Sequence, residues 1–316
     1  MRLSSLLLLL IFGVITSACQ SQKYADGIVS QSYVHRYGVP LPEEEWAQRG
    51  QDGQVVSMRK DGVRITQTYE GGVLHGETYY TYPHQDIHEK KERYNQGVLE
   101  EEFHYYQSGL PQKQITYCGP SSHKTIVWYE SGSPHCCETY EGGRLVNGEY
   151  YNLGYQLESQ VSDYNGQRIS RDPYGQVVSL DQIQQGELIQ STTYHPQGTP
   201  AAVSPYSNGQ IEGLRRTYSV SGEPLTIETW TGNTQHGKTI GFHNGERSYE
   251  VPYVQGQRNG VEYRYRDGEE LVQEVNWIDG KRHGQCHSYV GNKKQTDWYF
   301  QDQPVNKATF EALSHQ

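Results

Sequence analysis

One segment of the chain matches the sequence pattern of a nucleotide-binding loop. Residues 232–239 read Gly-Asn-Thr-Gln-His-Gly-Lys-Thr and satisfy the P-loop pattern at every required position. That pattern binds phosphate where a buried strand precedes the loop and a helix follows it, because amides at the helix N-terminus contact the phosphate. The residues after Thr239 are Ile-Gly-Phe-His-Asn-Gly, which disfavour a helix. We therefore expect a structural turn and no bound cofactor.

The thirteen histidines include pairs with metal-ligand spacing. His84 and His88 are four residues apart, as two ligands on one helix face would be, and His283 and His287 lie on either side of Cys286. Glutamine follows His84, so the catalytic glutamate of the zinc-protease motif is absent. Repetition explains three histidines that each precede a glycine, namely His75, His236 and His283. We expect no metal site.

The cysteines and the acidic residues give no catalytic pattern either. Cys136 and Cys137 are adjacent and point to opposite faces of a strand, while disulfides within or between chains stay open for Cys118, Cys136, Cys137 and Cys286. The run Glu100–Glu102 alternates between faces and indicates a solvated strand rather than an acid/base pair. We predict that the protein is not an enzyme.

Composition limits the fold before any element is placed. Only 34% of the 316 residues are hydrophobic and the mean hydropathy is −0.84, which disfavours the large aliphatic core of an α/β enzyme. Aromatic residues nevertheless make up 12% of the chain, with 27 tyrosines, and a disordered chain lacks them. The 34 glycines indicate many tight turns, and a net charge of −10 disfavours nucleic acid as a partner.

The N-terminus reads as an export signal. Met1 and Arg2 precede an apolar run from Leu3 to Ile15, and small residues end the segment at Ala18, which predicts a signal peptide over residues 1–18. The segment resembles a bacterial lipoprotein signal, in which the residue after the cleavage site is a lipidated cysteine. That resemblance implies acylation of Cys19, with palmitate among the acyl chains, and membrane anchoring. Glutamine after this cysteine resembles the sorting signal for the outer membrane of Gram-negative bacteria. We expect residues 19–45 to form a polar tether.

An internal repeat organises the rest of the chain. Aromatic residues precede a glycine turn at intervals of mostly 23 to 24 residues, and a second aromatic series lies between them. Tyr263 and Tyr265 alternate with charged residues, a period of two that indicates a half-buried strand. Asn-Gly and Asp-Gly dipeptides predict tight turns between strands. The first series comprises Trp46, Tyr69, Tyr94, Tyr117, Tyr140, Tyr164, Tyr206, Trp230, Tyr253 and Trp277.

These patterns predict an all-β fold. About eleven hairpin repeats over residues 46–300 would form an elongated, twisted antiparallel β-meander. Prolines at positions 111, 134, 200 and 224 each follow a turn glycine, where a strand can start without an N–H group. In the tail, residues 301–316, Asn306 can cap a short helix that places Phe310 and Leu313 over the last strand.

The hairpins resemble the MORN repeat, and especially the bacterial MORN-like variant of the YwqK-type repeat family. The clearest segments are Tyr69–Gly76, Tyr140–Gly148, Tyr206–Gly213 and Trp277–Gly284. The resemblance covers residues 46–300. It implies a meander used for binding or scaffolding, without catalytic residues.

The most favoured function is a protein-binding scaffold anchored at the cell envelope. Tyrosine on a pleated face presents rigid amphipathic surface, which is common at protein interfaces. The candidate binding surface comprises Tyr105, Trp128, Phe242, Tyr263 and Tyr265. One alternative is a repeat protein that binds cell-wall glycan, because tyrosine and tryptophan stack on sugar rings. A second alternative is an antitoxin-like module of the YwqK type.

Overall fold

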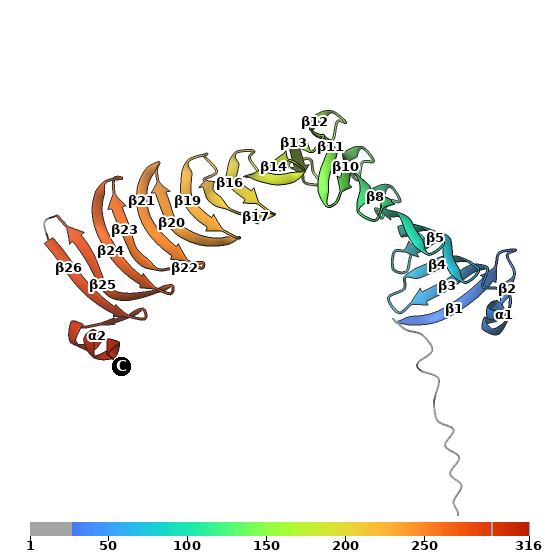
Figure 1. The fold of residues 1–316 in the computed structure, drawn as a ribbon, viewed down its shortest axis with the longest axis horizontal. Helices are drawn as coiled ribbons and strands as arrows, with labels where there is room; N and C mark the ends of the chain where they lie inside the picture. The colour runs from blue at the N-terminus through green and yellow to red at the C-terminus, as the bar shows by residue number, and fades with distance from the viewer. Residues whose placement is uncertain (1–26, 292, 316) are drawn as a thin grey trace, which may run out of the picture. The chain divides into compact units, whose positions relative to one another are not determined.

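The computed structural model describes residues 27–291 and 293–315. Within them the chain forms an open antiparallel meander, as predicted (Figure 1). It also contains two short helices, of which only the C-terminal one was predicted. Strands pair with their neighbours in the chain, as β19 does with β20, and β20 with β21. Neither helix in this part of the chain is long and apolar enough to cross a membrane. Cys19 and the predicted signal peptide lie outside the described residues.

The chain divides after Glu100 into two compact units. In the first unit, a small core of Leu41, Trp46 and Val55 packs with Tyr33 and Tyr69. Its elements are β1 Ile28–His35, β2 Pro40–Leu41, α1 Glu43–Gln48, β3 Gly53–Arg59, β4 Arg64–Glu70, β5 Val73–Thr81 and β6 His88–Asn95.

The prediction of a polar tether up to residue 45 was wrong from Ile28 onward. Strand β1 pairs with β3 along its length and extends the sheet, because its β-branched and aromatic residues Ile28, Val29, Tyr33 and Val34 favour a strand. Trp46, expected in a hairpin, lies in helix α1 and is 6% exposed. Three glutamates in the first turn of α1 favour the helix, since negative side chains stabilise a helix N-terminus. The Trp46 ring packs on Tyr33, with centroids 5.6 Å apart.

The second unit contains the longer run of hairpins. Its first strands are β7 Val98–Tyr105, which starts just before the unit boundary, β8 Pro111–Gly119, β9 Ser122–Trp128, β10 Pro134–Glu141, β11 Arg144–Tyr151, β12 Leu157–Ser162, β13 Asn165–Arg171, β14 Val177–Gln184 and β15 Glu187–Tyr194. They are followed by β16 Pro200–Ser207, β17 Gln210–Ile211, β18 Gly213–Tyr218, β19 Pro224–Thr231, β20 Thr234–His243, β21 Glu246–Val254, β22 Gln257–Arg258, β23 Gly260–Arg266, β24 Glu270–Ile278, β25 Lys281–Val290, β26 Lys293–Phe300, β27 Gln303–Val305 and α2 Lys307–Ser314.

The turns form where the sequence predicts them. Asn208, Asn244, Asp267 and Asp279 have φ values of 49–50°, as the first residue of a tight hairpin turn requires. The four prolines expected at strand starts are the first residues of β8, β10, β16 and β19. Local turn chemistry therefore sets the ends of these hairpins.

A second glycine in several repeats produces a kink within the hairpin. Gly260 has a φ of +108°, and a Cβ atom at this position would lie 2.9 Å from Cγ of Pro252 on the neighbouring strand. At the equivalent Gly237, the register of the pairing shifts by two residues, and the Thr229 hydroxyl donates to the carbonyl of Lys238 at 2.8 Å. The side chain thereby satisfies a carbonyl that the irregular pairing leaves free.

Hydrogen bonds also join successive repeats at their turns. The amides of Gly256 and Gly280 donate to the carbonyls of Gln235 and Arg258 in the preceding repeat, both at 2.9 Å. Earlier in the chain, the Tyr129 hydroxyl donates to the backbone carbonyl of Tyr151 in the next repeat, at 2.9 Å. Each repeat is thus linked to its neighbour beyond the strand pairing.

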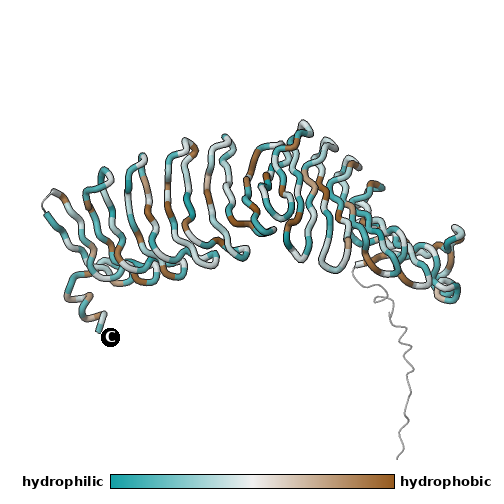
Figure 2. The backbone as a smooth tube through the Cα atoms, turned by 45° about the horizontal axis from the view of Figure 1, so that its top comes forward, coloured by the Kyte–Doolittle hydropathy of each residue, from teal (hydrophilic) through white to brown (hydrophobic). Residues whose placement is uncertain are grey.

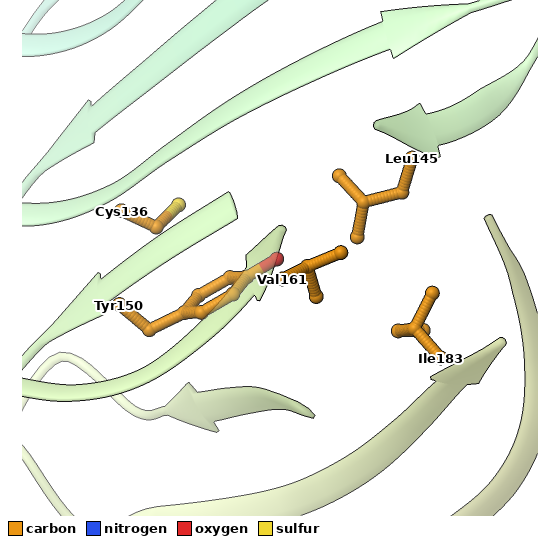
Figure 3. Packing of buried hydrophobic residues seen from close by; sticks show 5 residues of the cluster. All are labelled: Cys136, Leu145, Tyr150, Val161 and Ile183. Atoms are coloured by element: carbon orange, nitrogen blue, oxygen red, sulfur yellow. The ribbon is translucent and has the colours of Figure 1, made fainter. Parts of the chain in front are cut away.

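Apolar positions are spread along the hairpins between hydrophilic ones (Figure 2). The main buried cluster of the second unit contains Cys136, Leu145, Tyr150, Val161 and Ile183 from strands β10 to β14 (Figure 3). Tyr150 is 2% exposed, so tyrosine contributes to the core as the composition suggested.

The predicted C-terminal helix is present. Asn306 caps α2, because its side chain accepts a hydrogen bond from the amide of Thr309 at 2.8 Å. Phe310 packs against Trp298 and Phe300, with ring centroids 5.0 and 6.2 Å away. Leu313 remains 36% exposed, so Phe310 alone of the two predicted apolar residues makes the aromatic contact.

Candidate binding surface

Strand register defines two faces of the second unit. Residues directly opposite one another on paired strands share a face. One face, called here the core face, carries a row in which Thr239, Val251, Glu262, Val275 and Cys286 are all buried. The other is called the open face. Alternation along each strand then assigns the other side chains to a face, except where a bulge shifts the register, as it does between the pairs Gly241–Tyr249 and Phe242–Arg247.

The five predicted aromatic residues lie on the open face. Tyr263 follows buried Glu262, and its cross-strand partners are Glu250 and Glu274. All five side chains are half-buried: Tyr105, Trp128, Phe242, Tyr263 and Tyr265. The sequence therefore placed these residues on a common face, although alternation alone did not say whether that face was buried.

The structure brings three of the five together. Phe242 on β20 pairs with Arg247 on β21, and the Arg247 guanidinium lies 3.9 Å from the ring centroid of Tyr265 on β23. Arg247 also donates to Glu250 at 2.9 Å, and Glu250 faces Tyr263 across the strands. We call Phe242, Arg247, Glu250, Tyr263 and Tyr265 the open-face cluster.

Tyr105 and Trp128 lie on β7 and β9, far along the strand order from this cluster. The Tyr105 ring stacks on Phe103, with centroids 6.4 Å apart and planes 17° apart. The predicted surface is therefore two separate aromatic groups rather than one patch.

The sequence reasoning missed a set of carboxylates on the core face. Glu138 accepts hydrogen bonds from the hydroxyls of Tyr140 and Tyr150 at 3.0 and 2.8 Å. In the first unit, Glu92 accepts in the same way from Tyr80 and Tyr94, at 2.9 and 3.1 Å. The sequence signal is a glutamate two residues before an aromatic residue, because positions i and i+2 of a strand share a face. On the core face it recurs at Glu228–Trp230, whereas the same spacing at Glu149–Tyr151 lies on the open face, because Tyr150 between them is buried on the core face. In the first unit, Glu92–Tyr94 lies on the face of buried Thr78, and Glu77–Tyr79 lies on the opposite face.

These contacts keep the tyrosines protonated. Burial, followed by the adjacent Glu138 carboxylate, raises the pKa of Tyr140 to about 12. The same two causes raise the pKa of Tyr150, and burial together with Glu92 raises the pKa of Tyr80. Hydroxyls with such raised pKa values stay protonated at neutral pH, so they donate to these carboxylates and stabilise the sheet.

Arginines alternate with aromatic rings along the C-terminal hairpins. Arg258 is paired with Tyr253 across β21 and β22, and its guanidinium lies 4.8 Å from the ring centroid of Trp277 in the next repeat. Arg282 is paired with Trp277 and lies 4.2 Å from the Tyr299 ring centroid. Cation–π contacts of this kind link one repeat to the next.

The segment resembling a P-loop forms part of a hairpin. Residues 232–233 form a turn, and strand β20 follows where a P-loop would need a helix. Lys238 forms an ion pair with Glu250 at 2.8 Å. The segment thus has the structural role that the sequence predicted.

The paired histidines and the cysteines do not converge. His84 lies in a turn and His88 begins β6, where its ring stacks on Tyr79. In β25, Cys286 is buried on the core face, whereas His287 contacts Thr296. Among the described residues, the four cysteines are unpaired and no group of three or more His, Cys, Asp or Glu could bind a metal ion.

No family model and no curated protein matches the chain. Among solved structures, it is similar to part of TcdB2-TccC3-Cdc42, with 10% identity over 83% of this chain and a TM-score of 0.16. This chain spans 20% of the length of that protein. A porin-like protein from Bacteroides uniformis has 10% identity, 78% coverage of this chain, 90% coverage of its own and a TM-score of 0.11. TM-scores this low carry no argument about fold or function.

Proposed function

We propose that this protein is an exported lipoprotein of the cell envelope, anchored by acyl chains on Cys19, in the outer membrane of a Gram-negative bacterium. In this proposal its repeat array is a scaffold that binds an envelope protein. The N-terminal sequence supports the anchor, because an apolar run ends in small residues directly before a cysteine. The protein carries no catalytic role in this proposal.

The open-face cluster is the single observation that best supports the proposed protein-binding role. Phe242, Tyr263 and Tyr265 present half-buried aromatic surface, with Arg247 and Glu250 between them. Aromatic residues and arginine are enriched at protein interfaces, where they combine apolar contact with hydrogen bonding. The Arg247 side chain is already held between the Tyr265 ring and the Glu250 carboxylate, so binding requires little further ordering of it.

The scaffold is tested by capture of envelope proteins on the purified protein. We expect saturable retention of a defined protein, and we expect Tyr263→Ser with Tyr265→Ser to abolish it. Tyr174→Ser is the matched control, because Tyr174 is 84% exposed and lies in a turn outside the cluster. Circular dichroism confirms that each variant is folded. Equal retention by the double variant and the native protein would contradict the proposed surface.

The anchor is tested separately by Cys19→Ala. We expect the variant to be exported but to leave the membrane fraction after a salt wash, because two or more acyl chains bind a bilayer far more firmly than residual protein contacts. Intact mass of the native mature protein should show cleavage before Cys19 and added acyl chains. Unchanged membrane retention of Cys19→Ala would rule out the anchor.

A further inference from the structure

The C-terminal hairpins form a groove on the core face, opposite the open-face cluster. It has a volume of about 420 Å³ and crosses strands β23 to β26. Val275 and Cys286 lie at its base, 4% and 5% exposed, and the rings of Trp277 and Tyr299 line one side. This size falls within the ~300–1,000 Å³ typical of sites for small ligands.

The groove exists because a tyrosine found earlier in the array is replaced. Tyr249, Arg264, Gln273 and Ser288 are successive cross-strand neighbours in one row. The Tyr249 ring covers Gly241 so closely that a Cβ atom on Gly241 would lie 2.0 Å from it. At Gln273 and Ser288 the row has no ring, so the space above Val275 and Cys286 stays open.

The two arginines of the groove have carboxylate partners, whereas Asp297 has none among the described residues. Arg264 donates to the buried carboxylate of Glu262 at 2.6 Å, and Arg282 donates to Asp302 at 3.2 Å. Asp297 has no ion pair with any described residue and accepts only from Gln295, at 3.2 and 3.3 Å.

Two uncharged polar side chains complete the lining. Gln273 and Ser288 form no side-chain hydrogen bond to the described residues, and they face the groove beside Arg264. Glutamine and serine can each donate and accept, while Asp297 accepts. The groove therefore offers free donors and acceptors together, next to aromatic surface.

We propose that this groove binds a neutral saccharide. A ligand with several hydroxyl groups can donate to Asp297 while it accepts from Gln273 and Ser288, and its apolar ring face can lie against Trp277 or Tyr299. An anion would meet the unpaired Asp297 carboxylate, and a cation would meet Arg264 and Arg282. The groove lies on the other face from the proposed protein-binding surface, so this inference does not depend on the scaffold.

The test is calorimetric titration of the folded protein with chitotetraose, cellotetraose and maltotetraose, and with a tetraglycine peptide and oligogalacturonate for comparison. We expect at least one neutral oligosaccharide to bind saturably. Gln273→Tyr restores the ring that the row carries at Tyr249 and should abolish binding. Asp297→Ala should weaken binding about tenfold, as the loss of one hydrogen bond to a charged group implies.

Gln285→Tyr is the matched control. Gln285 is an exposed residue of β25 that lies on the open face, between Gly284 and Cys286. It receives the same substitution as Gln273 and should bind the oligosaccharide as the native protein does. Absence of binding to all three oligosaccharides, preference for the peptide or the acidic oligomer, or full binding by Gln273→Tyr would each overturn the proposal. None of these results bears on capture of a protein by the open-face cluster.

Discussion

Buried carboxylates are the main polar anchors of individual strands. Glu262 is 3% exposed and accepts hydrogen bonds from Arg258, Arg264 and the Trp277 indole. Three donors from three positions fix these side chains across strands β22 to β24. An unsatisfied partner would be costly there, since a buried polar group without a hydrogen bond lowers stability.

Replacement of this carboxylate should therefore destabilise the protein. We expect Glu262→Ala to lower the free energy of unfolding by about 2–3 kcal/mol, because hydrogen bonds to a charged group contribute more than neutral ones. Glu270→Ala is the control, since Glu270 is 55% exposed in its ion pair with Arg266 and should cost less than about 1 kcal/mol. Urea denaturation measures both. Equal effects of the two substitutions would contradict this role of Glu262.

The tyrosine–carboxylate contacts predict a loss of stability at alkaline pH. The pKa of Tyr140 is raised to about 12 in the folded protein, from an ordinary value of 10.0. A group with a raised folded-state pKa contributes stability that is fully present below its unfolded pKa and is lost as pH rises through the folded value. Stability should therefore fall between about pH 10 and pH 12.

Urea denaturation across this pH range measures the effect. Tyr140→Phe should make the alkaline decline less steep, because one of the shifted hydroxyls is removed. Tyr174→Phe should leave the decline unchanged, because Tyr174 is 84% exposed. An identical pH profile for Tyr140→Phe and the native protein would show that this hydroxyl is not linked to folding.

At the scale of the element, glycines with positive φ allow the strands of a hairpin to kink. Gly260 and Gly284 both have positive φ, at +108° and +93°. They differ in their surroundings, because a Cβ atom at Gly260 would lie 2.9 Å from Pro252, whereas at Gly284 the nearest atom is 4.0 Å away. Substitution at Gly260 therefore adds a steric clash to the backbone strain that both positions share.

We expect Gly260→Ala to destabilise the protein by about 1 kcal/mol or more. Gly284→Ala should cost less, since only the backbone strain applies there. Thermal denaturation of the two variants provides the comparison. A larger effect at Gly284 would mean that the Pro252 contact does not limit this kink.

At the scale of the whole molecule, we expect the protein to fold after one complete repeat is removed. Tyr253 pairs with Gly237 and Arg258, and Trp277 pairs in the same way with Gly260 and Arg282. Removing residues 253–276 places Trp277 where Tyr253 was, so each following residue keeps its face of the sheet.

We expect this shortened protein to fold, with a β-sheet circular dichroism spectrum and a cooperative thermal transition. Removing only residues 253–264 should prevent native folding of the C-terminal hairpins, because the remaining strand would run in the wrong direction for antiparallel pairing. Folding of the half-repeat deletion as well as the full one would contradict this account of the repeat.

The sequence by itself determined the hairpins and their order. Asn-Gly and Asp-Gly turns, strand-starting prolines and alternation around Tyr263 are local signals, and local signals act wherever they occur in the chain. The helix cap at Asn306 is local in the same sense. These features predicted the all-β meander and the C-terminal helix.

Only the tertiary structure decided how residues from different strands meet. Cross-strand register placed Tyr150 on Glu138, split the five predicted aromatic residues into two groups, and aligned Gln273 with Ser288 above buried Val275. Residues 28–35, whose composition suggested a tether, gained a place in the sheet through pairing with β3. Such contacts depend on bulges and on partners many residues away, and hydrogen bonding and burial across strands outweigh the local pattern there.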